Sequence, residues 1–315
     1  MLHSLHPQPR SSNSSDTHIH LDAAVVQSAC SNSQHYHDAA VTLVSVCFPG
    51  SSYWLGLCPL AKSHFHDYAQ FNSFGLCWFT SNLATPRHPA WSKIPAILAA
   101  MRSQSAEYVF WSDPDTVFMN FSSHALVLPP IGIDMAYSGY FNSWFDRRCV
   151  NAAHMIFRSS SWSQALLRAV WEVYPEPRPA DWWMEQASMQ YILSGQRQEC
   201  RNAVLSYGIE YNPSNNSWFL PMEPKFRAHP RDSCCKPQGQ WAARSMRVPP
   251  RALESWPSLM PFGKTAVPTA LQVPAALYQD GDLLVSFPGI HREERVRLLR
   301  NWLNRSRNLN REYKP

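Results

Sequence analysis

The feature that most limits the fold is a series of short apolar segments that alternate with helical patterns in the first half of the chain. The predicted elements are, in order, a strand at 40–48, a helix at 62–74, a strand at 76–80, a helix at 91–101 and a strand at 107–111. The first strand is rich in β-branched residues and is followed by Pro-Gly, a pattern that is typical of a buried parallel strand. Strands that alternate with helices favour a doubly wound α/β sheet, in which ligands bind beyond the carboxyl ends of the strands.

The rest of the chain continues this pattern less regularly. Further predicted elements are strands at 133–137, 152–157 and 283–287 and helices at 161–174, 184–193 and 292–305. Residues 199–276 are rich in Pro and Arg and have little periodicity, so we expect loops and short strands there. We divide the chain into a loosely ordered leader (1–38), a single domain (39–305) and a basic tail (306–315).

Composition and charge exclude several classes of protein. The net charge of +5 is small, and the basic residues near the C-terminus alternate with glutamates, which is typical of a solvated helix and argues against a nucleic-acid partner. The eight cysteines contain no Cys-x-x-Cys pair, which argues against a zinc ribbon. Their even number fits disulfides in a secretory compartment, with the pairing left open. The longest apolar stretch, 39–60, is interrupted by Pro49 and Gly50, so we read it as a strand and a loop.

The strongest candidate for a functional site is Asp113-Pro114-Asp115, which directly follows the strand predicted at 107–111. Two carboxylates at this spacing can both reach a hard divalent cation, which prefers oxygen ligands and commonly bridges carboxylates to phosphates. Asp-Pro-Asp is also ordinary turn chemistry, so the motif alone leaves a capped turn open. Its place at the end of a buried strand favours the metal site.

Five segments together resemble glycosyltransferase family 34, whose members include fungal galactosyl- and mannosyltransferases and plant xylosyltransferases. They are Trp91-Ser92-Lys93, the run Tyr108 to Asn120 with its Asp-x-Asp, the run Asn151 to Arg158 followed by Trp162, Trp183-Met184-Glu185-Gln186, and Asp280 to Gly289. They occur in the family's order and extend over roughly residues 40–305. The resemblance implies a single-domain GT-A fold, Rossmann-like, with a mixed central sheet and flanking helices.

The resemblance also implies an activity: transfer of a hexose or pentose from a nucleotide-sugar to a glycan or glycoprotein acceptor, with retention of anomeric configuration. Relatives use UDP-galactose, UDP-xylose or GDP-mannose, together with Mn²⁺ or Mg²⁺. The metal ligands would be Asp113 and Asp115. Lys93 would lie near the donor phosphates, and Asn151 would bind the donor sugar or position the acceptor. Glu185 and Gln186 would contact the sugar at the reaction centre.

This chain departs from the family's pattern at two positions. Ser286 stands where the family usually has the histidine that completes the metal site, and Ala153 replaces a small glycine. His291 is the nearby residue that we predict as a substitute ligand. The departure leaves an alternative open, a catalytically degenerate GT-A protein that binds a sugar or nucleotide.

Two other enzyme classes fit less well. Alternate residues such as Asp113 and Asp115 lie too close together to flank a glycosidic bond as hydrolase carboxylates do. No phosphate-binding Gly-x-x-x-x-Gly-Lys loop is present for phosphoryl transfer.

The family implies the Golgi or the secretory lumen as the location of the protein. We see no signal or anchor in this sequence, so a membrane association would need an anchor outside it. The oligomeric state stays open, with homo- and hetero-oligomers included.

Overall fold

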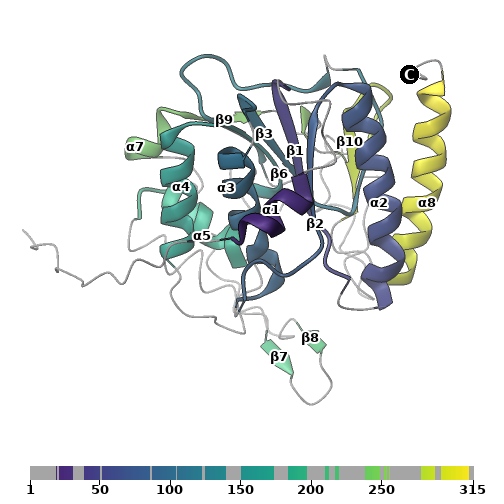
Figure 1. Cartoon of the computed structure of the whole chain (residues 1–315), viewed down its shortest axis with the longest axis horizontal. Helices are drawn as coiled ribbons and strands as arrows, with labels where there is room; N and C mark the ends of the chain where they lie inside the picture. Colours follow the sequence, from purple (N-terminus) through teal and green to yellow (C-terminus); the bar gives the residue numbers. More distant parts are fainter. Residues whose placement is uncertain are drawn as a thin grey trace, which may run out of the picture.

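A computed structural model gives the fold of the chain. It describes residues 19, 21–30, 39–49, 52–85, 87–103, 105–122, 125–139, 150–173, 184–196, 210–212, 217–219, 238–248, 252–253, 255, 278–287 and 292–311. In this part of the chain a central sheet lies between two groups of helices (Figure 1).

The central sheet has six strands in the order β2-β1-β3-β6-β5-β9. These strands are β1 (Val41–Val46), β2 (Gly75–Phe79), β3 (Tyr108–Ser112), β5 (Met135–Gly139), β6 (Val150–Arg158) and β9 (Ser245–Val248). β1 runs parallel to β2 and β3, and β9 runs parallel to β5. β6 is antiparallel to both of its neighbours. The prediction of a mixed central sheet with flanking helices is therefore confirmed.

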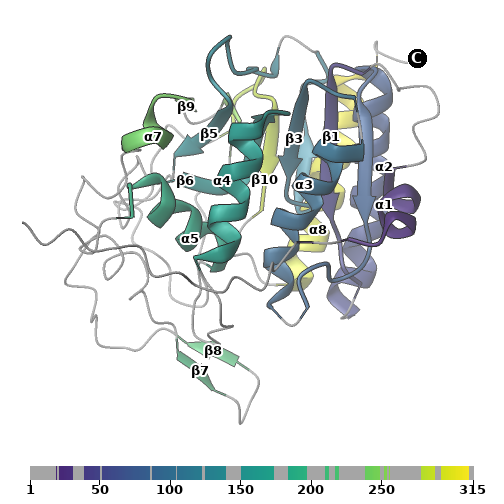
Figure 2. The ribbon, with the colours of Figure 1, turned by 60° about the vertical axis from the view of Figure 1, so that its left-hand side comes forward.

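Both faces of the sheet are buried, because helices cover each of them, and side chains alternate between the two faces along each strand. Leu43 points into one core and Val44 into the other. The Val44 face is covered by α1 (Ala23–Cys30), η2 (Pro89–Ser92), α3 (Lys93–Ser103), α4 (Ser161–Glu172) and α5 (Met184–Leu193). The Leu43 face is covered by α2 (Ser52–Phe71), α8 (Arg292–Leu309) and a small antiparallel sheet of β4 (Thr116–Phe118) and β10 (Leu284–Ser286). Figure 2 shows α3 and α4 in front of the sheet and α8 behind it.

The region 199–276, expected to hold loops and short strands, contributes few described elements. They are the hairpin of β7 (Glu210–Asn212) and β8 (Ser217–Phe219), the short helix α7 (Gly239–Ala242) and the edge strand β9. The sequence predicted neither α7 nor β9 as a separate element, because each is only four residues long. Short elements leave too few positions for a periodic pattern to stand out.

The main difference from the predicted elements is the start of α2. We expected a loop before residue 62, whereas the helix begins at Ser52 and contains Pro59. Leu57, Ala61 and Phe65 recur every four residues and are completely buried on the sheet side. Pro59 lies on the exposed side of the helix. Burial of the apolar face thus outweighs the hydrogen bond that a proline removes from a helix.

Two disulfides attach helices to the β2–β1 edge of the sheet, one on each face. Cys30 of α1 is bonded to Cys77 of β2, and Cys47 after β1 is bonded to Cys58 of α2. The described cysteines are all paired, and the other four lie outside the described residues. α1 belongs to the segment 1–38 that we expected to be loosely ordered, and its disulfide attaches it to the sheet.

Gly75, which lies between the helix predicted at 62–74 and the strand predicted at 76–80, is the first residue of β2. It stands opposite Thr42 of β1, and a Cβ at this position would lie 2.8 Å from the Thr42 hydroxyl oxygen. The close approach of the two strands therefore requires glycine here.

Among the described helices, none has the length and apolar character needed to cross a membrane.

Candidate active site

The Asp113-Pro114-Asp115 turn joins the central sheet to the small sheet. It follows β3 directly and leads into β4. The Asp113 amide donates a hydrogen bond to the Ala153 carbonyl of β6 (2.9 Å), and the Asp115 carbonyl accepts one from the Phe287 amide after β10 (3.1 Å). Backbone contacts on both sides thus hold the turn at the carboxyl end of β3, the place that the sequence predicted for it.

A pocket of about 370 Å³ opens at this turn. It is lined by Val46, Phe48, His88, Pro89, Ala90, Lys93, Trp111, Asp113, Pro114, Asp115, Glu185 and Arg295. The lining has an apolar part that comes mainly from the end of β1 and from η2. Its charged part holds two cationic and three acidic side chains, contributed by the β3–β4 turn and by α3, α5 and α8.

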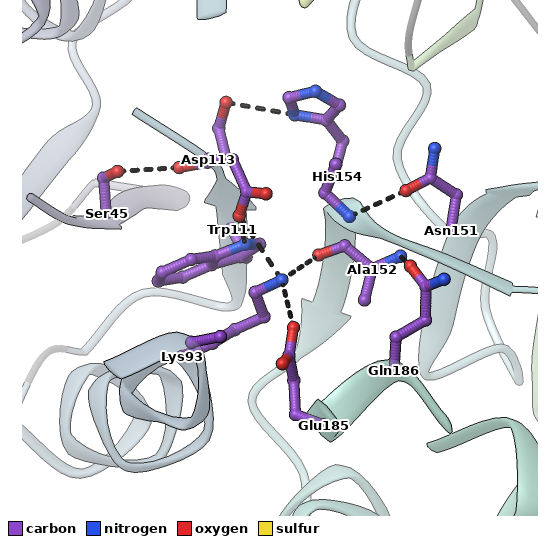
Figure 3. A network of polar contacts seen from close by, with 12 residues as sticks. Ser45, Lys93, Trp111, Asp113, Asn151, Ala152, His154, Glu185 and Gln186 are labelled. Atoms are coloured by element: carbon purple, nitrogen blue, oxygen red, sulfur yellow. Dashed lines mark hydrogen bonds and ion pairs between the residues drawn. The ribbon is translucent and has the colours of Figure 1, made fainter. Parts of the chain in front are cut away.

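Lys93 is the central cation of the pocket. It is the first residue of α3, and its ammonium group donates to Glu185 Oε1 (2.8 Å) and to the Ala152 carbonyl (2.6 Å), as Figure 3 shows. It also lies 3.3 Å from Asp113 Oδ1 and 5.3 Å from the centre of the Trp111 ring. Burial alone would lower the pKa of Lys93, but the carboxylates of Asp113 and Glu185 raise it above its ordinary value. Lys93 therefore stays charged although its side chain is almost completely buried.

Asp113 is held but still accessible. Its Oδ1 accepts a hydrogen bond from Trp111 Nε1 (2.9 Å) in addition to the contact with Lys93. A third of the side chain remains exposed (32%), so the carboxylate faces the pocket. Burial raises the pKa of Asp113 to about 6, with Lys93 opposing the shift and the nearby carboxylates of Asp115 and Glu185 adding to it. A bound cation would reduce the repulsion between these three carboxylates.

Asp115 is paired with an arginine that the sequence analysis did not single out. Its Oδ2 accepts from Arg295 of α8 at 2.7 Å, and both side chains are largely buried (12% and 15% exposed). Arg295 was assigned to a solvated basic helix. The spacing of Arg295, Leu299 and Leu303 on one helical face is the signal that would have placed it toward the core, because the two leucines are buried.

Of the predicted sugar-contacting residues, Glu185 lines the pocket and Gln186 and Asn151 do not. Gln186 Oε1 accepts from the Ala152 amide (2.8 Å), and Asn151 Oδ1 accepts from the Ala153 amide (3.0 Å). Figure 3 shows both carboxamides beside the strand that also supplies the Ala152 carbonyl to Lys93. Gln186 thus links α5 to the first half of β6, whereas the Asn151 hydrogen bond lies within β6 itself. Their proposed contacts with a sugar stay predictions.

The predicted third metal ligand is not among the described residues, because His291 lies outside them. Ser286 is buried in β10 opposite Thr116. The described residues include no cluster of three His, Cys, Asp or Glu side chains that could hold a metal ion. Asp113 and Asp115 nevertheless line one pocket, and Mg²⁺-type cations are commonly held by one or two carboxylates together with substrate phosphates and water. The two carboxylates fit a cation that the ligand itself helps to bind.

Comparison with known families identifies the class of protein as a glycosyltransferase. Residues 61–136 match the galactosyl transferase GMA12/MNN10 family, which confirms the resemblance to glycosyltransferase family 34. The match covers less than half of the chain, from within α2 to β5, and it includes Lys93, Asp113 and Asp115. Asn151, Glu185 and Gln186 lie beyond it.

Three solved structures that are similar to this chain have low sequence identity to it. A glycosyltransferase involved in glycosylation of the major capsid of PBCV-1 is 13% identical, with a TM-score of 0.48 over 83% of this chain and 99% of that one. A Drosophila β-1,4-galactosyltransferase 7 in complex with manganese, UDP-Gal and xylobiose is 11% identical, with a TM-score of 0.29 over 41% and 52%. GlyE of Streptococcus pneumoniae is 12% identical, with a TM-score of 0.29 over 49% and 43%. A comparison with curated proteins gives no match.

Proposed function

We propose that this glycosyltransferase binds the diphosphate of a nucleotide-sugar in the pocket at the Asp113-Pro114-Asp115 turn. It would transfer a hexose or pentose to a glycan or glycoprotein acceptor with retention of anomeric configuration. The observation that carries the proposal is the charged cluster at the carboxyl end of β3, in which Lys93 and Arg295 meet Asp113, Asp115 and Glu185. In α/β sheets this end of the strands is where ligands bind.

The charges of the pocket support a divalent cation as cofactor. Three carboxylates outnumber the two cationic side chains, so a donor diphosphate would enter a pocket that is already net negative. Mn²⁺ or Mg²⁺, held by Asp113, Asp115 and phosphate oxygens, would supply the missing positive charge and stabilise the leaving diphosphate. His291 is the further ligand that we propose.

The remaining roles follow from the contacts of the side chains. Lys93 holds Glu185 and Asp113 in fixed positions, because it contacts both carboxylates from a buried site. Glu185 would place negative charge near the donor sugar, which becomes cationic as the bond to phosphate breaks. The apolar residues Val46, Phe48 and Pro89 offer a surface on which the base or the sugar ring could pack. The acceptor hydroxyl would attack the anomeric carbon from the face that the diphosphate leaves, and the departing phosphate oxygen would take its proton. The protein would then need neither a nucleophile nor a general base of its own.

The experiment that tests this proposal is a binding screen of UDP-galactose, UDP-xylose and GDP-mannose by thermal shift, each with and without Mn²⁺. We expect one donor to raise the melting temperature only when Mn²⁺ is present, because a ligand that binds the folded state stabilises it. A shift by a nucleotide-sugar without any dependence on metal and without turnover would support the alternative of a degenerate binding protein. The absence of any shift with all three donors would contradict the proposal.

We also propose that the protein works in an oxidising compartment, the lumen of the secretory pathway such as the Golgi. The two disulfides among the described residues support this, since disulfides persist mainly in such compartments. Alkylation of free thiols in protein isolated from its native cells would test it. Labelling of Cys30 or Cys77 before any reduction would contradict the proposal.

A further inference from the structure

The ion pair between Asp115 and Arg295 conflicts with the role proposed for Asp115. The Arg295 guanidinium donates to Asp115 Oδ2 at 2.7 Å, and both side chains line the pocket. A carboxylate that is engaged by a guanidinium offers a poorer site to a divalent cation, because the cation must compete with a charge-assisted hydrogen bond. The same guanidinium is well suited to phosphate, which it can bind through two parallel hydrogen bonds.

The position of Arg295 is built into the fold. Arg295, Leu299 and Leu303 lie four residues apart on one face of α8, and the two leucines are buried in the core shared with β4. Further along the helix, the Ser306 hydroxyl donates to the Phe118 carbonyl of β4 at 2.6 Å. Because Asp115 immediately precedes β4, docking of α8 on this strand brings the first turn of the helix to the carboxylate.

We infer that Arg295 pairs with Asp115 in the donor-free protein and keeps it from binding a cation. When the donor binds, the Arg295 guanidinium moves to the donor diphosphate. Arg295 then has two opposite effects. It weakens binding of a divalent cation alone, since it occupies Asp115, and it strengthens binding of the nucleoside diphosphate together with the cation. Metal and donor would thus bind as a pair. The inference rests on the proposed function, and it assigns to Arg295 a role in donor binding.

The test measures two affinities in three variants. Mn²⁺ binding without nucleotide and binding of UDP or GDP at saturating Mn²⁺ are measured by calorimetry for the wild type, Arg295→Met and Arg297→Met. Arg297 is the matched control, because it lies on the same helix but is exposed and pairs with Glu294. We expect Arg295→Met to bind Mn²⁺ alone about tenfold more tightly, because Asp115 is no longer occupied. We expect the same variant to bind the nucleoside diphosphate about 10- to 100-fold more weakly.

The opposite signs of the two changes distinguish this account from a structural role. If Arg295 only held Asp115 in place, its removal would weaken both affinities together and would overturn the inference. Unchanged affinities for Mn²⁺ and for UDP or GDP in Arg295→Met would also overturn it. Arg295→Lys keeps the positive charge, so it should restore part of both effects, and thermal unfolding confirms that each variant is folded.

The outcomes also separate this inference from the proposed function. If the wild type binds neither UDP nor GDP in the presence of Mn²⁺, the proposed function fails and the role of Arg295 fails with it. If the wild type binds one of them and Arg295→Met binds it equally well, the proposed function stands and only the inference is wrong.

Discussion

Replacement of Lys93 by methionine should destabilise the protein strongly, because it leaves a buried carboxylate without its partner. The ammonium group lies 2.8 Å from Glu185 and 3.3 Å from Asp113. With an effective dielectric constant of about 20, the attraction to Glu185 alone is about 6 kcal/mol. Desolvation of the three groups offsets much of this, whereas removal of one partner from a buried pair typically costs about 3–5 kcal/mol. We therefore expect Lys93→Met to lower the free energy of unfolding by about 3–5 kcal/mol.

A double-mutant cycle isolates the part that comes from the ion pair. Glu185→Gln removes the charge with little change of shape, so the double variant Lys93→Met/Glu185→Gln no longer buries an unpaired carboxylate at that position. We expect it to be more stable than the sum of the single changes predicts, by at least about 1.5 kcal/mol. Urea unfolding followed by tryptophan fluorescence gives the four free energies.

Lys62→Met is the matched control for this cycle. Lys62 is an exposed lysine on α2, so its replacement should change stability by less than about 0.5 kcal/mol. A cost below about 1 kcal/mol for Lys93→Met, or strict additivity of Lys93→Met and Glu185→Gln, would refute the reasoning. Either result would mean that Lys93 is not a buried partner of the carboxylates.

Three further predictions concern stability. Burial lowers the pKa of His64 to about 3 from its ordinary 6.5, so the folded protein keeps this histidine neutral while the unfolded chain takes up a proton below pH 6.5. As the pH decreases from 6.5 toward 3, the free energy of unfolding should decrease by about 1.4 kcal/mol per pH unit because of this histidine. His64→Gln should remove that part of the pH dependence in urea unfolding measured from about pH 6.5 to about pH 4. Loss of the Cys30–Cys77 disulfide, which joins residues 47 positions apart, should cost about 4 kcal/mol in Cys30→Ser/Cys77→Ser, and an unchanged urea midpoint would contradict this. Gly75→Ala should cost about 1–3 kcal/mol through the contact with Thr42, and adding Thr42→Ala should recover part of it if that contact is the cause.

Much of the fold could be predicted from local patterns. The first three strands of the central sheet along the chain, β1, β2 and β3, are mainly apolar runs such as Val41–Val46, and their alternation with helices gave the α/β class. The position of Asp113 and Asp115 followed from the end of a single strand, β3. These predictions succeed because local periodicity and burial agree along this part of the chain.

The parts that could not be predicted depend on contacts between distant segments. The start of α2 is set by packing of Leu57 and its neighbours on the sheet, which overrides the local signal of Pro59. The pair of Asp115 and Arg295 joins residues 180 positions apart, and no local pattern reveals such a contact. The burial of Glu185 against Lys93 likewise appears only when α3 and α5 come together.

The central claim is that the carboxylates of Asp113 and Asp115 hold the divalent cation that binds the donor diphosphate during glycosyl transfer from a nucleotide-sugar. The most direct measurement is the release of UDP or GDP from UDP-galactose, UDP-xylose and GDP-mannose in the presence of Mn²⁺, compared between the wild type and Asp113→Asn. The account predicts that the wild type releases the nucleoside diphosphate from one donor and that chelation of the metal abolishes this release. The rate of release should decrease at least about 100-fold in Asp113→Asn, because this variant binds the cation that stabilises the leaving diphosphate more weakly. Equal rates in the wild type and Asp113→Asn, or release that persists unchanged in the presence of a chelator, would contradict it.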